Sequence, residues 1–133
     1  MNPDLSWVLN DVLQVRGARH AILVSADGLL LERSSDIGRD EAETNAAAMS
    51  SMQSLSRAVA PFVSAGNGVW KQTLIEYDGG WIFLIAAGQG AYLAVSAALD
   101  VDMESMSFRM QQQVSALGKA MTTPPRQSAG ADV

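Results

Sequence analysis

The chain has 133 residues, of which 48% are hydrophobic and 17% are charged. This length and composition predict one globular domain with a single hydrophobic core. The net charge of −5, with only nine scattered lysines and arginines, argues against a surface for nucleic acid or an anionic membrane, since both need clustered basic residues. The sequence has no cysteine, which excludes disulfides and thiolate chemistry.

The N-terminal segment lacks the basic region and the apolar run that are typical of a signal peptide; it reads MNPDLSWVLN. The sequence also has no apolar run near the ~18 residues that a membrane-spanning helix requires. We therefore expect a cytoplasmic protein without direct membrane insertion.

Hydrophobic periodicity and turn residues predict a helix, two strands, a long helix, three strands and a last helix. The strands are expected at residues 20–25, 29–33, 69–77, 81–87 and 91–97, and the helices at 5–13, at 40–62 and from Asp100 or Asp102 to Met121. Short turns make the sheet mainly antiparallel, and helices on both faces predict an α+β fold, a three-layer α/β/α sandwich. We assign residues 1–121 to this domain and expect residues 122–133, which have low hydrophobicity, to be a disordered tail.

The long helix predicted from Asp40 to Phe62 has two different faces. An apolar stripe at steps of three and four residues predicts packing against the sheet: Ala48, Met52, Leu55, Val59 and Phe62. Beside it runs a stripe of mostly small residues, which lets another backbone approach closely: Ala42, Ala46, Met49, Gln53, Ser56 and Ala60. We interpret this second stripe as a partner surface; the alternative is that alanine and serine only form solvated helix surface. Asp40 and Glu43 have the spacing of a capping box, and Pro61 should kink or end the helix near Ala60.

The third predicted strand, residues 69–77, is polar enough to lie at an edge of the sheet, where Lys71 and Thr73 would be exposed. Exposed edges favour pairing with another chain. The edge and the small-residue stripe together predict a homodimer, with an interface formed by Ala42, Ala46, Met49, Gln53, Ser56, Ala60, Lys71 and Thr73.

Catalytic chemistry has little support in the sequence. His20 is the only histidine, so the usual zinc sites cannot form, and no G-x-S-x-G motif is present. The Gly88-Gln89-Gly90 segment precedes a predicted strand rather than a helix, and therefore indicates a hairpin turn and not a phosphate loop. Arg57 is interpreted as a solvated arginine, with charge stabilisation in a partner as the alternative. We predict no catalytic, cofactor-binding or metal-binding residues.

The element order and spacing resemble those of the roadblock family, the dynein light-chain type domain that is also found in bacterial regulators of small GTPases. The resemblance covers residues 5–121 and rests on three segments: AILVSADGLLL, EAETNAAAMSSMQSLSRAV and IEYDGGWIFLIAAGQGAYLAVSA. The alanine-rich style is similar to that of actinobacterial roadblock proteins, which accompany a sensor kinase and a Ras-like GTPase. These partners are therefore expectations that the resemblance implies.

The resemblance implies a profilin-like, five-stranded antiparallel sheet and a homodimer joined through the long helix and the third strand. In family members that bind GTPases, the paired long helices form the platform. Carried over by position, the candidate GTPase contacts are Asn45, Met49, Gln53, Ser56 and Arg57. Because family members that activate GTPases generally reposition the GTPase's own residues, we do not interpret Arg57 as an arginine finger.

Our first functional hypothesis is a non-enzymatic homodimeric regulator or scaffold for a small Ras-like GTPase in a bacterial signalling system, with modulation of GTP hydrolysis as a further expectation. The alternative is a small-ligand sensor of the profilin-, PAS- or GAF-like type, for which the sequence offers few converging polar residues. A direct enzyme is a third option, against which the residue inventory argues.

Overall fold

The computed structural model describes residues 4–66, 68–88 and 90–122. It contains four helices and five strands in this part of the chain: α1 (Ser6–Val12), β1 (Ala18–Ser25), β2 (Leu30–Arg33), α2 (Arg39–Ala58), α3 (Ala60–Val63), β3 (Gln72–Tyr77), β4 (Gly80–Ala86), β5 (Ala91–Ala98) and α4 (Met103–Thr122). The predicted tail lies outside the described residues, except for Thr122, which is the last residue of α4.

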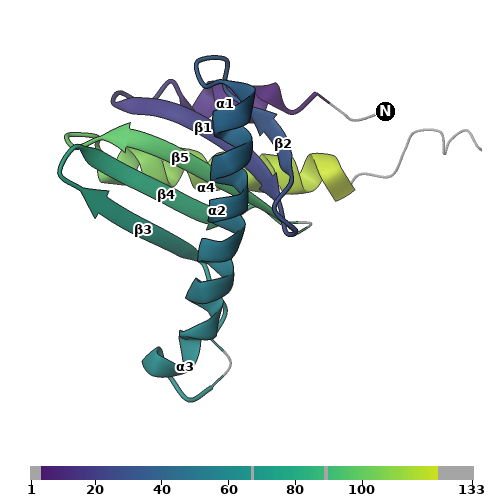
Figure 1. Ribbon diagram of the computed structural model, residues 1–133, viewed down its shortest axis with the longest axis vertical. Helices are drawn as coiled ribbons and strands as arrows, with labels where there is room; N and C mark the ends of the chain where they lie inside the picture. The colour runs from purple at the N-terminus through teal and green to yellow at the C-terminus, as the bar shows by residue number, and fades with distance from the viewer. Residues whose placement is uncertain (1–3, 67, 89, 123–133) are drawn as a thin grey trace, which may run out of the picture.

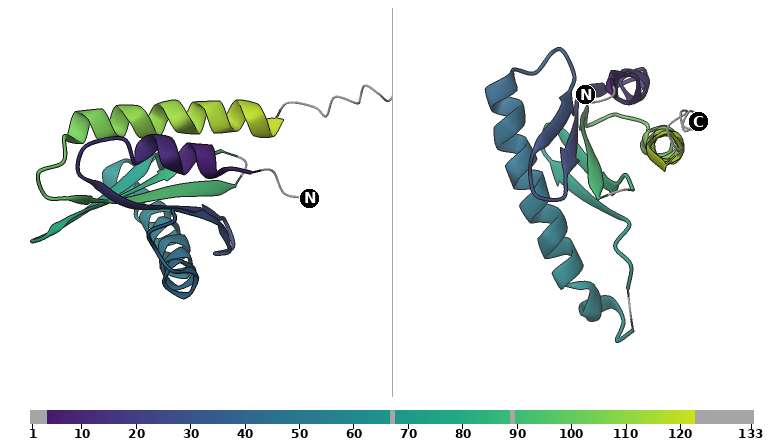
Figure 2. Two further views of the ribbon diagram at one scale, coloured as in Figure 1. Left: turned by 90° about the horizontal axis from the view of Figure 1, so that it is seen from above. Right: turned by 90° about the vertical axis from the view of Figure 1, so that its right-hand side faces the viewer.

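The strands form one antiparallel sheet in the order β2-β1-β5-β4-β3 (Figure 1). Helix α2 lies on one face of this sheet, and α1 and α4 lie on the other (Figure 2). The predicted three-layer α+β fold with a five-stranded antiparallel sheet is therefore confirmed. Strands β2 and β3 are the outer strands, as the polarity of β3 predicts.

The larger part of the core lies between the sheet and the pair α1 and α4. Apolar side chains of α1 and α4 pack there on those sheet residues that point to this face; the fully buried members are Val8, Leu9, Val12, Leu23, Phe83, Leu93, Met106, Met110 and Leu117. Asp102 caps α4, because its side-chain oxygen Oδ1 accepts a hydrogen bond from the backbone N–H of Ser105 at 3.1 Å. This confirms one of the two caps predicted for the last helix.

A smaller core lies under α2, and it reverses the predicted assignment of the two helix faces. Ala42 and Ala46 are fully buried, and Met49 and Gln53 are nearly so, against Ile22, Val24, Leu84, Tyr92 and Ala94 of the sheet. The stripe predicted to cover the sheet points largely outward, with Leu55, Val59 and Phe62 exposed. The predicted assignment was wrong because small side chains let α2 itself approach the sheet closely, so the small stripe packs within the chain.

The ends of α2 also differ in detail from the prediction. Gly38 occupies the N-cap position, so Asp40 lies within the first turn, and Glu43 pairs with Arg39 at 3.5 Å rather than completing a capping box. At the other end, α2 stops at Ala58 and the short helix α3 contains Pro61 at its start. The predicted break near Ala60 is confirmed.

Candidate interaction surface

The end of α2 and the whole of α3 project beyond the sheet (Figures 1 and 2). Four large apolar side chains are exposed on this projection: Leu55 (68%), Val59 (60%), Phe62 (95%) and Val63 (87%). Leu55 and Val59 have no cover because their stripe of α2 points away from the sheet, and Phe62 and Val63 have none because α3 lies past the last strand.

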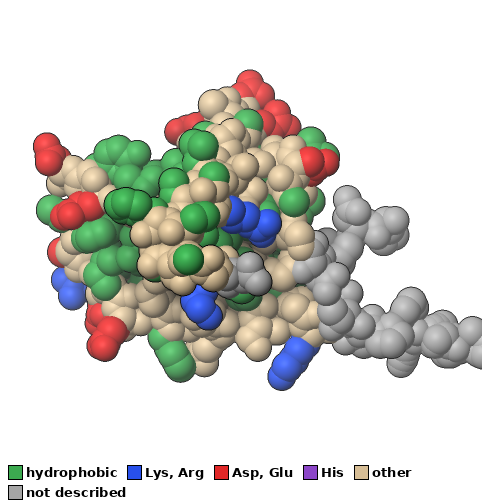
Figure 3. Space-filling view, turned by 90° about the horizontal axis from the view of Figure 1, so that it is seen from below, with side chains coloured by type: hydrophobic (Ala, Val, Ile, Leu, Met, Phe, Trp, Pro, Cys, Tyr) green, Lys and Arg blue, Asp and Glu red, His purple; other side chains and the backbone are tan. Residues whose placement is uncertain are grey.

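The segment that leads into β3 extends this apolar surface, because Val69 there is 81% exposed. Leu74 is 42% exposed, but it pairs with Phe83 of the core under α1 and α4, so its side chain points to the face of the sheet opposite α2. We call the five residues Leu55, Val59, Phe62, Val63 and Val69 the α2–β3 surface. Figure 3 shows the underside of the molecule, where apolar side chains lie in view. Clustered exposed apolar residues next to an outer strand are typical of a protein–protein interface.

A polar and aromatic cluster fixes the end of α2 over the beginning of β3. The hydroxyl oxygens of Ser56 and Thr73 lie 2.7 Å apart, and the indole N–H of Trp70 donates to Thr73 Oγ1 at 2.8 Å. The ring of Trp70 meets that of Tyr92 edge-on at 5.8 Å, and Arg57 donates to the Tyr92 hydroxyl at 3.4 Å. These contacts hold the projecting helix at a defined angle to the edge strand.

The residues predicted for the dimer interface fall into two groups. Ala42, Ala46, Met49 and Gln53 are buried within the chain, so they offer little or no surface to a partner; Ser56, Ala60 and Thr73 are half-buried, and Lys71 is exposed. The large apolar residues that are exposed near these positions are Leu55, Val59 and Phe62, which the prediction assigned to the sheet, together with Val63 and Val69, which it did not name. One signal in the sequence could have identified these exposed residues. The apolar stripe continues to Pro61, at the end of a helix that is too long for a small sheet to cover completely.

The candidate GTPase contacts also differ from one another in their exposure to solvent. Met49 and Gln53 are buried, Asn45 and Ser56 are half-buried, and Arg57 is exposed. The solvent face of α2 instead carries short side chains, all exposed: Thr44, Ala47, Ala48, Ser51, Ser54 and Ala58. A helix face with short side chains lets a partner approach its backbone closely.

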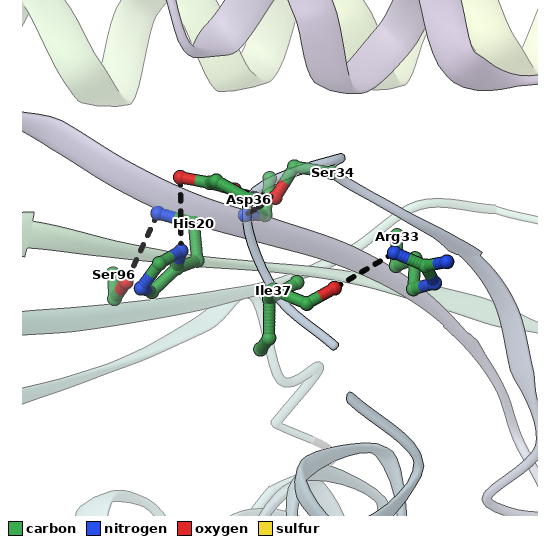
Figure 4. Close-up of polar contacts among 7 residues, drawn as sticks. His20, Arg33, Ser34, Asp36, Ile37 and Ser96 are labelled. Carbon is green, nitrogen blue, oxygen red and sulfur yellow. Dashed lines mark hydrogen bonds and ion pairs between the residues drawn. The ribbon is translucent and has the colours of Figure 1, made fainter. Parts of the chain in front are cut away.

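His20 belongs to a structural polar cluster that anchors the loop between β2 and α2 (Figure 4). Its Nδ1 lies 3.1 Å from a carboxylate oxygen of Asp36, and Asp36 also accepts from the Ser34 hydroxyl at 2.8 Å. Ser34 in turn accepts from the backbone N–H of Ala21 at 3.0 Å. Partial burial opposes ionisation of Asp36, but the hydrogen bonds from Ser34 and His20 outweigh it and lower the pKa of Asp36.

Two further findings bear on chemistry in the described part of the chain. Within residues 4–66, 68–88 and 90–122, histidine and acidic side chains form no group of three or more that could hold a metal ion. No described helix combines the length and the hydropathy of a bilayer-spanning segment.

The fold is profilin-like: LokiProfilin2, in a complex with rabbit actin, is similar over 90% of this chain and 98% of its own, with 11% identity and a TM-score of 0.56. The sequence matches the Roadblock/LC7 domain over residues 6–97. The chain therefore belongs to the Roadblock/LC7 domain family.

Two solved structures show how far the likeness of the fold extends. A Roadblock/LC7 domain from Streptomyces avermitilis is 29% identical and covers 91% of this chain and 100% of its own, with a TM-score of 0.84. The gliding protein MglB from Thermus thermophilus is 18% identical and covers 86% of each chain, with a TM-score of 0.75, which shows a common fold. Among curated protein sequences, none matches this chain.

Proposed function

We propose that this chain is a non-enzymatic homodimeric regulator or scaffold that binds a small Ras-like GTPase in the cytoplasm of a bacterium and modulates its GTP hydrolysis. The observation that carries the proposal is the α2–β3 surface, where exposed apolar side chains adjoin an outer strand. Membership of the Roadblock/LC7 family supports it.

The physical properties of this surface support self-association. Phe62 and Val63 are almost fully exposed, and removing such side chains from water stabilises an assembly by roughly 25 cal/mol per Å² of apolar area. The outer strand β3 offers main-chain hydrogen bonds to a second β3 in the same place. A two-fold axis at this edge would cover the exposed apolar side chains and pair the two β3 strands in one interface, because each copy presents the same surface.

A GTPase would then bind on the solvent faces of the two α2 helices. Thr44, Ala48 and Ser51 leave this face shallow and accessible. Arg57 is held by the Tyr92 hydroxyl at 3.4 Å, which supports a positioning role within the domain rather than insertion into a partner's active site.

Binding to purified bacterial Ras-like GTPases, each loaded with GDP or with a GTP analogue, tests the proposal by calorimetry. We expect one GTPase to bind in a nucleotide-dependent way, and Ser51→Arg on the outer face of α2 to abolish binding while the mass of the dimer stays unchanged. The matched control is Ser115→Arg, at an exposed position of α4 on the other side of the sheet, which should bind normally. Binding that survives Ser51→Arg would contradict the assignment of the platform to α2.

A further inference from the structure

A cavity of about 190 Å³ lies on the α2 face of the sheet, beside the helix. Its lining is mainly apolar and includes Ile22, Ile37, Met49, Ile82 and Ala94, with His20, Glu41, Asn45 and Ser96 among the polar residues. This volume is below the ~300 Å³ typical of small-molecule sites, yet a dry cavity of about 150 Å³ in another protein holds a benzene molecule. The cavity therefore has the size and lining to hold one aromatic side chain.

The position of α2 leaves this half of the sheet uncovered. The helix is fixed over one end of the strands: Ser50 donates to the carbonyl of Ala26, just after β1, at 3.0 Å, and Ser56 meets Thr73 near the start of β3 at 2.7 Å. The cavity lies toward the opposite ends of the strands, near the start of β1, the start of β4 and the end of β5, where Ile82 and Ser96 are only half-buried.

The proposed two-fold axis at β3 determines what would cover that half. Two β3 strands related by this axis run antiparallel, so the start of one lies beside the end of the other. Because α2 crosses the sheet over the start of its own β3, the partner's α2 arrives at the end of this chain's β3, next to Tyr77. Its projecting end then continues across β4, since α2 and α3 extend past the sheet in that direction (Figure 1).

The reach of the projecting helix matches the position of the cavity. Phe62 follows Ser56 by six residues; an unbroken helix advances about 9 Å over this separation, and the break at Val59 turns α3 aside from the α2 axis. Neighbouring strands are about 4.8 Å apart, so an advance of up to about 9 Å reaches at most two strands. In the proposed dimer, the first strand beyond the partner's β3 is this chain's β3 and the second is this chain's β4. On β4, Ile82 pairs with Ile75, which lies near the end of β3.

From this geometry we infer that the cavity is a receptor for Phe62 of a second copy of the chain, and that the two copies fill each other's cavities reciprocally. The inference rests on the proposed homodimer and deepens it. It accounts for two otherwise separate features, an aromatic side chain that is 95% exposed and an apolar cavity that this chain leaves open. Each copy completes the core of the other.

Cysteine pairing tests the inference directly, because the chain has no cysteine of its own. Phe62→Cys and Ile82→Cys variants are purified separately, mixed, allowed to exchange subunits, and oxidised. We expect a disulfide-linked dimer on a non-reducing gel, since only a contact between copies joins the two sites. The control mixes Phe62→Cys with Leu29→Cys, an exposed position in the turn before the other outer strand, and should give no such product.

The outcomes separate this inference from the proposed function. A disulfide between the Phe62→Cys and Ile82→Cys variants, together with a Kd for self-association raised about 10-fold or more by Phe62→Ala, supports it. If the wild-type chain has the mass of a dimer but the two cysteine variants form no disulfide with each other, the cavity has another occupant and the inference is wrong, while the dimer stands. If the wild-type chain is a monomer, both the inference and the proposed homodimer fail.

Discussion

The hydroxyl oxygens of Ser56 and Thr73 lie 2.7 Å apart, and this contact joins the long helix to the outer strand of the sheet. Thr73 also accepts the indole N–H of Trp70 at 2.8 Å, so one side chain serves two partners. The contact places the apolar end of α2 beside the β3 edge and thereby brings the parts of the α2–β3 surface together.

Thr73→Val should destabilise the chain by about 1–3 kcal/mol, because it leaves the half-buried Ser56 hydroxyl and the Trp70 indole N–H without their partner. Ser56→Ala should cost less, about 1 kcal/mol, because Trp70 keeps its acceptor. Urea denaturation measures both free energies of unfolding. Equal losses of stability for the two variants would show that Thr73 does not link Ser56 and Trp70.

Val59→Glu should weaken self-association by at least about 10-fold with little effect on the free energy of unfolding, because the side chain is 60% exposed and the charge would be buried only in the dimer. Phe108→Glu is the matched control, since Phe108 on α4 is 65% exposed on the other side of the sheet. Sedimentation equilibrium measures both dissociation constants. If Phe108→Glu raised the dissociation constant more than Val59→Glu does, the interface would lie on α4 instead.

Ala46→Glu should unfold the chain or destabilise it by more than about 4 kcal/mol, because the side chain is fully buried between α2 and the sheet and the site offers no partner for a charge. Ala47→Glu, at the neighbouring exposed position, should change stability by less than about 0.5 kcal/mol. Circular dichroism during thermal unfolding distinguishes the two. A stably folded Ala46→Glu variant would contradict the position of the small-residue stripe against the sheet.

Asp36 should make the chain sensitive to acid. Its pKa is lower in the folded chain than the ordinary value of 3.8, so its contribution to stability is present above about pH 4 and is lost as the pH falls through the folded pKa. Asp36→Asn should therefore lower the free energy of unfolding at about pH 6 and flatten its decline below about pH 4. Urea titrations between about pH 2 and pH 6 measure this difference. Parallel curves for the two proteins would exclude the contribution of Asp36.

The sequence was sufficient to predict the order of elements, because strands and helices carry different hydrophobic periods and glycine marks the turns. It was not sufficient to orient α2, because alanine at Ala42 and Ala46 suits a close intrachain contact and a close contact with a partner equally well. Which face packed inward depended on the position of α2 over the sheet.

Two polar contacts, one in the loop between β2 and α2 and one beside the candidate surface, were also beyond local sequence patterns. His20 meets Asp36, and Arg57 meets Tyr92, across separations that no spacing rule connects. Similarly, the exposure of Phe62 depends on where the sheet ends beneath α2. Such facts follow from strand order and crossing geometry rather than from the periodicity of one segment.

The mass of the wild-type chain in solution, measured by light scattering across a dilution series, tests the central claim most directly. We expect a species near twice 14.1 kDa that persists into the micromolar range, and a Val59→Glu variant that is folded and shifts to the monomer mass. A wild-type chain that is monomeric at every concentration would contradict self-association through the α2–β3 surface.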